Sequence, residues 1–114
     1  SEDLSWRRHT QEVSREAGRD LTRITSVMEE FVDYGVKEPL LVYLTTHLQR
    51  LGKTEEEILM ILMPLIIYQE SSRRDILYFL AFPWTRKKLA IRNKEDRESL
   101  LNTLLEKIER LRSE

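Results

Sequence analysis

Cysteine is absent from this sequence, and histidine and glycine are scarce. Without cysteine there is no disulfide bond, no thiol nucleophile and no cysteine-ligated zinc. Only His9 and His47 are present, and the three glycines are isolated, so the chain carries no HExxH, GxSxG or glycine-rich phosphate-binding motif. We therefore expect no catalytic site, no metal site and no intrinsic cofactor within these 114 residues.

Long apolar runs are also missing. The longest stretch, residues 58–68, is far shorter than the ~20 residues that span a bilayer, and no signal-peptide pattern is visible. The formal net charge is −1, so any electrostatic binding site is a local patch and not the whole surface. These features predict a cytoplasmic protein with no membrane partner. Because the chain opens at Ser1 without a methionine, we expect a domain cut from a longer protein.

The apolar residues recur at helical spacing, and no segment alternates with a period of two. We predict an all-α fold, a single compact bundle of five or six helices over residues 1–114. The expected helices run from about Thr10 to Tyr34, from Glu38 to Gly52, from a Thr54 cap through Ile66, from a cap at Ser71 or Ser72 to Phe82, and from an Asn93 cap through Leu111, with a short element from Thr85 to Arg92. The third of these is apolar on nearly every side, which predicts the central, buried helix, kinked at Pro64.

Residues 82–92, FPWTRKKLAIR, combine two aromatic rings with four cations and no acid. If Thr85 caps a helix, then Arg86, Lys87 and Lys88 occupy its first turn, where the dipole already places about half a positive charge. Each cation there costs roughly 0.3–1 kcal/mol. Other expected helix starts in this chain carry acids instead. A bound anion would relieve the cost, and local rules are most often broken at functional sites.

The residue types around this segment suit a nucleic acid, because phosphates pair with arginine and lysine while bases stack on aromatic rings. The predicted nucleic-acid- and nucleotide-binding residues are Arg73, Arg74, Tyr78, Trp84, Arg86, Lys87, Lys88 and Arg92. Phe82 is assigned to the core. Trp84 fits either a core plug at the helix break or an exposed stacking ring, and a short basic run also fits a solvated face.

Other readings of the cations and helices stay open at this point. The same surface, with Trp84 as its anchor, suits the docking of an acidic protein partner. If the N-terminal segment folds beside residues 84–92, the cations of the two segments would form one groove. The N-terminal cations are Arg7, Arg8, Arg15, Arg19 and Arg23. A helix-turn-helix over residues 38–66 is disfavoured, because three glutamates would face the DNA. The leucine stripe at 100–111 is typical of bundle core.

Part of the chain resembles a known family. The run from Leu40 to Glu57, followed by an apolar helix and then by Ser71-Ser72-Arg73-Arg74-Asp75, is similar to the helix-bundle domain that follows the catalytic domain in archaeal plasmid primases of the prim-pol type. The similarity covers about residues 38–97. It consists of an apolar helix, a turn containing Arg50 and Gly52, and an acid-capped helix.

The resemblance implies an accessory role in DNA replication. In such primases the catalytic carboxylates lie in a preceding domain of the same chain, and the helix bundle helps to capture the single-stranded template and nucleotides before primer synthesis. The partners it implies for this chain are single-stranded DNA, nucleotide triphosphates such as ATP, and a catalytic nucleotidyltransferase domain.

Overall fold

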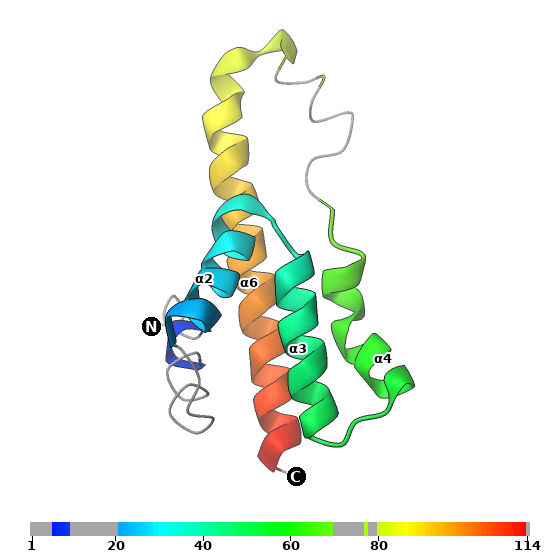
Figure 1. Cartoon of the computed structure of the whole chain (residues 1–114). Coiled ribbons are helices and arrows are strands. Elements are labelled where there is room, and N and C mark those ends of the chain that lie inside the picture. Colours follow the sequence, from blue (N-terminus) through cyan, green and yellow to red (C-terminus); the bar gives the residue numbers. More distant parts are fainter. Residues whose placement is uncertain (1–5, 10–20, 70–76, 78–79, 114) are drawn as a thin grey trace.

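The computed structural model describes residues 6–9, 21–69, 77 and 80–113, and these contain helices and turns but no strand. The prediction of an all-α bundle is confirmed. The elements are α2 (Leu21–Tyr34), α3 (Glu38–Arg50), α4 (Glu55–Ile66), the 3₁₀ turn η2 (Pro83–Thr85) and α6 (Arg86–Ser113). Figure 1 shows α6 as the long central helix, with α2 and α3 beside it and α4 on the far side of α3. The N-terminal part of the first expected helix and most of the expected helix from Ser71 lie outside the described residues.

Two glycines with positive φ, Gly35 and Gly52, follow the ends of α2 and α3. Gly52 has φ +82° and follows α3; its N–H donates to the carbonyl of Gln49, and the N–H of Lys53 donates to that of Leu48. This is a Schellman ending, which needs a left-handed residue. Thr54 then opens α4 with a complete capping box to Glu57. The α3–α4 hairpin is therefore encoded locally.

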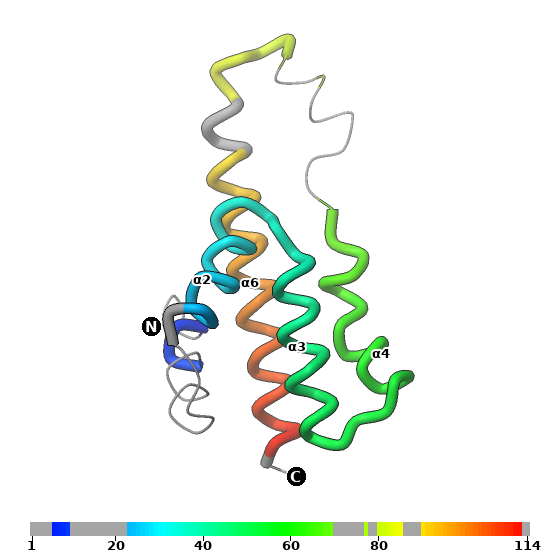
Figure 2. Tube along the Cα trace, in the orientation of Figure 1, coloured from blue at the N-terminus to red at the C-terminus, as the bar shows by residue number. Residues whose placement is uncertain are grey.

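α4 is not the central helix that its composition predicts. It buries Ile58, Ile61, Leu62 and Leu65 against the bundle, but Leu59 is 53% exposed and Met60 is 74% exposed. α4 lies at the edge of the bundle (Figure 2), and one of its two apolar faces is left exposed. The prediction is wrong because periodicity counts apolar faces without saying which of them meets a neighbour.

α6 is one continuous helix of 28 residues, so the expected break and cap at Asn93 are also wrong. No glycine or proline occurs between Arg86 and Ser113. Asparagine costs only a few tenths of a kcal/mol inside a helix, so a cap-like sequence at Asn93 does not interrupt it. The C-terminal half of α6 supplies core residues, and the leucine stripe is bundle core as predicted; its buried members are Leu101, Leu104, Leu105 and Ile108.

The N-terminal segment packs onto this body. Residues 6–9 are helical, and Trp6, only 2% exposed, belongs to the core. His9 is also 2% exposed, and its Nδ1 lies 2.9 Å from Oε1 of Glu109 near the end of α6. The ring of His47, half-buried on α3, meets the His9 ring edge-on. The N-terminal segment is therefore held at the C-terminal end of α6.

Candidate nucleic-acid interface

The N-terminal end of α6 projects beyond the other described helices (Figure 1), and the aromatic pair Phe82 and Trp84 lies just before it in the sequence. Trp84 in η2 is 73% exposed and Phe82 is 41% exposed, with the two rings packed edge-to-face at 5.3 Å. Thr85 closes the turn, since its N–H and its hydroxyl both donate to the carbonyl of Phe82, at 3.0 and 2.7 Å. Phe82 is not a core residue, and that prediction is wrong because this end of the molecule lies beyond the core.

The sign of charge at the start of α6 is the one deduced from the sequence. The helix begins at Arg86, so Arg86, Lys87 and Lys88 form its first turn, which contains no acid. In contrast, α3 has Glu38 in its first turn and α4 has three glutamates. Arg92 follows further along α6 and is exposed. An exposed indole therefore lies directly before a cationic helix start, as a phosphate and base site requires.

The three remaining predicted site residues, Arg73, Arg74 and Tyr78, lie outside the described residues. Leu77 and Leu80, which precede the aromatic pair in the sequence, are 66% and 70% exposed, so this part of the chain exposes aliphatic as well as aromatic side chains.

The N-terminal cations do not join this site where they are described. Arg7 lies 4.5 Å over the Trp6 ring and 3.4 Å from the carboxylate of Glu29. This segment is anchored beside Glu109, roughly 35 Å along α6 from Arg86 at 1.5 Å per residue. A single groove formed by residues 6–9 and residues 84–92 is therefore excluded by the fold.

The first turn of α4 is occupied with capping, which speaks against a recognition helix. Glu57 accepts a hydrogen bond from the backbone N–H of Thr54 at 3.0 Å, and the Thr54 hydroxyl accepts one from the N–H of Glu57. The bond from the Thr54 backbone, and then its hydroxyl, lower the pKa of the Glu57 carboxyl. Glu55, Glu56 and Glu57 are exposed and would meet DNA phosphates with like charge.

Sequence reasoning missed Tyr34, which is 76% exposed at the end of α2. Beside it an open groove of about 520 Å³ runs between the end of α2 and the upper part of α6. The residues lining it are Asp33, Tyr34, Ala90, Ile91, Asn93, Lys94 and Arg97. No sequence signal marks this groove, because Tyr34 and Ile91 become neighbours only when α2 packs on α6.

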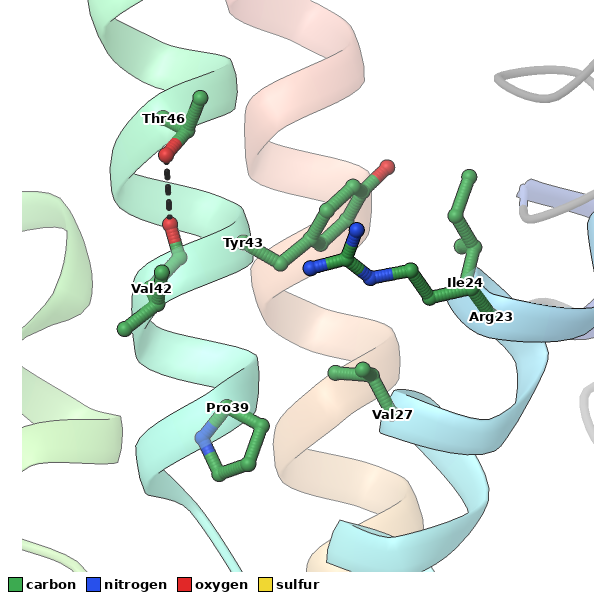
Figure 3. Close-up of a pocket in the computed structure, with 7 residues that line it drawn as sticks. All are labelled: Arg23, Ile24, Val27, Pro39, Val42, Tyr43 and Thr46. Atoms are coloured by element: carbon green, nitrogen blue, oxygen red, sulfur yellow. Dashed lines mark hydrogen bonds between the residues drawn. The ribbon is translucent and has the colours of Figure 1, made fainter. Parts of the chain in front are cut away.

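A second pocket, of about 460 Å³, lies between α2 and α3 (Figure 3). Arg23 reaches over it from α2 and Tyr43 from α3, above an apolar floor that includes Val27 and Pro39. The hydroxyl of Thr46 is committed to the carbonyl of Val42 at 2.9 Å. Among the lining residues that the structure describes there is no acid, so these side chains offer no general acid–base pair.

Within the described ranges, no group of three histidine, aspartate or glutamate side chains is placed to hold a metal ion. None of the described helices is both long enough and apolar enough to cross a bilayer. In comparisons with known proteins, no family model matches the chain, and no match is found among curated proteins or among solved structures.

Proposed function

We propose that the projecting end of α6 binds single-stranded nucleic acid. The observation that carries the proposal is the exposed ring of Trp84, 73% accessible, directly before a helix start whose first three residues are Arg86, Lys87 and Lys88. A ring at this position can stack on a base while the cations beside it neutralise phosphates. Stacking is worth roughly 1–3 kcal/mol per base and tolerates any base, so the binding is expected to depend little on sequence.

The helix dipole supports an anionic ligand. Free N–H groups and the dipole make the start of any helix attractive to phosphate. In α6 the three cations add to that field instead of being balanced by acids as in α4. Bound phosphate would remove the repulsion between these like charges, so ligand binding is expected to stabilise this end of the helix.

The ligand and the biological setting follow from the primase resemblance. We propose that the strand is template DNA and that the same cationic turn accepts the triphosphate of ATP or another nucleotide. In this role the bundle is an accessory domain of a replication enzyme, and the phosphodiester chemistry belongs to a separate catalytic domain. Arg73, Arg74 and Tyr78 would extend the surface, and Arg92 would hold a further phosphate.

A second function is favoured by the exposed aliphatic side chains that precede the aromatic pair in the sequence. Leu77, Leu80 and Phe82 are exposed together with Trp84. Large apolar groups ringed by cations are typical of a docking site for an acidic protein segment, in which a buried tryptophan serves as the anchor. This alternative does not need the ring to stack on a base.

Fluorescence anisotropy with a labelled oligothymidylate, and with labelled ATP in a parallel titration, tests the first function. Trp84→Ala is expected to weaken oligonucleotide binding roughly fivefold to a hundredfold, the loss of one stacked base. Trp84→Phe should retain most of the affinity, whereas Trp84→Leu should not, because leucine keeps apolar area but has no π face. Lys87→Glu should weaken the binding of both the oligonucleotide and ATP. Met60→Ala, at an exposed site on α4, serves as the matched control.

The alternatives separate in the same experiment. If Trp84→Leu binds as well as Trp84→Phe, the ring acts through apolar area, and docking of a protein is the better description. If the unaltered protein binds neither oligonucleotide nor ATP at low salt, the nucleic-acid function is wrong.

A further inference from the structure

We propose that the groove between the end of α2 and α6 is a second base-binding subsite, with Tyr34 as its stacking ring. The ligand is a nucleobase of the same single strand that Trp84 holds, a few nucleotides along. The inference rests on the proposed nucleic-acid function and adds to it a second stacking residue and a path for the strand along α6.

The groove has a defined wall, because α2 is fastened to α6 where it ends. Arg97 is only 4% exposed; its Nε donates to the carbonyl of Val32 at 2.7 Å and its Nη2 to that of Asp33 at 3.2 Å. Nearby, Nζ of Lys94 lies 3.3 Å from the carboxylate of Asp33. Tyr34 follows immediately, so its backbone is fixed against α6 while its ring is 76% exposed. A ring presented from a fixed backbone loses little entropy on stacking.

The groove continues the face of α6 that begins at the cationic turn. Lys87, Ile91 and Lys94 occupy positions i, i+4 and i+7 of one helix, so these positions share a face. Seven residues of helix correspond to about 10 Å of rise. A strand with its phosphates at the first turn of α6 is thus led along this face toward Tyr34.

The electrostatics of the groove suit a base and not a phosphate. The carbonyl end of α2 carries the negative end of the helix dipole, and Asp33 adds a carboxylate. Arg97 and Lys94 already contact these groups. An uncharged aromatic base fits between the exposed ring of Tyr34 and the exposed side chain of Ile91. The phosphates stay near the cationic first turn of α6.

Binding as a function of oligonucleotide length tests the subsite. Labelled oligothymidylates of about 4 to 16 nucleotides cover the range of single-strand site sizes. Tyr34→Ala is expected to leave the affinity for the shortest oligonucleotide unchanged and to weaken the longest roughly fivefold to a hundredfold, as for one lost stack. Tyr34→Phe should match the unaltered protein at every length. Trp84→Ala should weaken binding at every length.

A second readout does not depend on affinity. Oligonucleotides with one photoreactive 5-iodouracil, moved stepwise along the strand, should crosslink to Trp84 from one position and to Tyr34 from another. If Tyr34→Ala binds all lengths normally while Trp84→Ala is weakened, the second subsite is wrong and the proposed function stands. If crosslinks form at Trp84 alone, the subsite is likewise wrong. If the unaltered protein binds no oligonucleotide, both proposals fail together.

Discussion

Arg97 is a buried cation at the point where α2 ends against α6. It is 4% exposed, and it donates to two carbonyls in the last turn of α2. Carbonyls in that turn lack partners within their own helix, and the dipole there favours a positive charge. A cation that would be costly in an apolar core is therefore stabilised here. These two hydrogen bonds join α6 to α2 through residues that are 65 and 64 positions apart in the sequence.

Replacing this guanidinium should destabilise the whole fold. Arg97→Met keeps much of the side-chain volume but leaves the carbonyls of Val32 and Asp33 without these donors. Hydrogen bonds from charged groups contribute about 1.5–3 kcal/mol, and we expect a loss of that size in the free energy of unfolding, measured by urea denaturation. Arg92→Met, at an exposed position of the same helix, should change it by less than about 0.5 kcal/mol. Equal effects of the two substitutions would contradict this role.

At the scale of elements, the first turns of the helices differ in the sign of their charged residues. α4 begins with a reciprocal capping box and three acids, so its sequence, its hydrogen bonds and its dipole all agree. α6 begins with three cations that oppose its dipole. Such a conflict is the pattern expected where a site is optimised for binding and not for stability.

The capping box gives a prediction for stability and for pH. Thr54→Ala should destabilise the protein by about 1 kcal/mol, since an N-cap hydroxyl is lost. The pKa of Glu57, lowered by the Thr54 N–H and then by its hydroxyl, should rise only part of the way back, because the backbone bond remains. As this pKa is depressed in the folded state, its stabilising effect is present above the ordinary glutamate pKa and is lost as the pH falls through the folded value. NMR titration of Glu57 in both proteins measures the shift, and an unchanged pKa would count against the hydroxyl's part.

Substitutions on the two faces of α4 should change the free energy of unfolding by very different amounts. Leu62 is 1% exposed, so Leu62→Ala is expected to cost about 2–5 kcal/mol through lost burial and a cavity. Met60 is 74% exposed, so Met60→Lys should stay within about 0.5 kcal/mol of the unaltered protein. Thermal or urea unfolding of both variants measures these two changes in stability. A large loss for Met60→Lys would mean that the exposed face of α4 is covered in solution.

At the scale of the whole molecule, the proposed binding site is set apart from the core. The molecule measures 49 × 29 × 22 Å, and the start of α6 lies at one end of the long axis (Figure 1). The buried side chains gather in the other part, around Phe31, Leu44 and Leu105. Substitutions at Trp84 can therefore remove a binding surface without disturbing the packing that holds the bundle together.

The net charge limits how binding should depend on salt. With a formal charge of −1 overall, attraction to DNA comes from the local cations Arg86, Lys87, Lys88 and Arg92. Four phosphate contacts on a single strand predict a slope of log K against log salt of about −3. Lys87→Glu should flatten that slope. A slope near zero in the unaltered protein would show that phosphates are not bound, and a much steeper one would require cations outside this set.

The sequence by itself determined the helices and their charge, because periodicity, caps and end charges act over a few residues. Its all-α prediction is confirmed, as are the Gly52 ending, the Thr54 box and the cationic turn after Thr85. Only the tertiary structure decided which apolar groups are covered. It exposed Met60, Phe82 and Trp84, joined two expected elements into α6, and set Tyr34 beside that helix. Burial depends on which helices pack against each other, and neither hydrophobicity nor spacing along the chain says directly which helices these are.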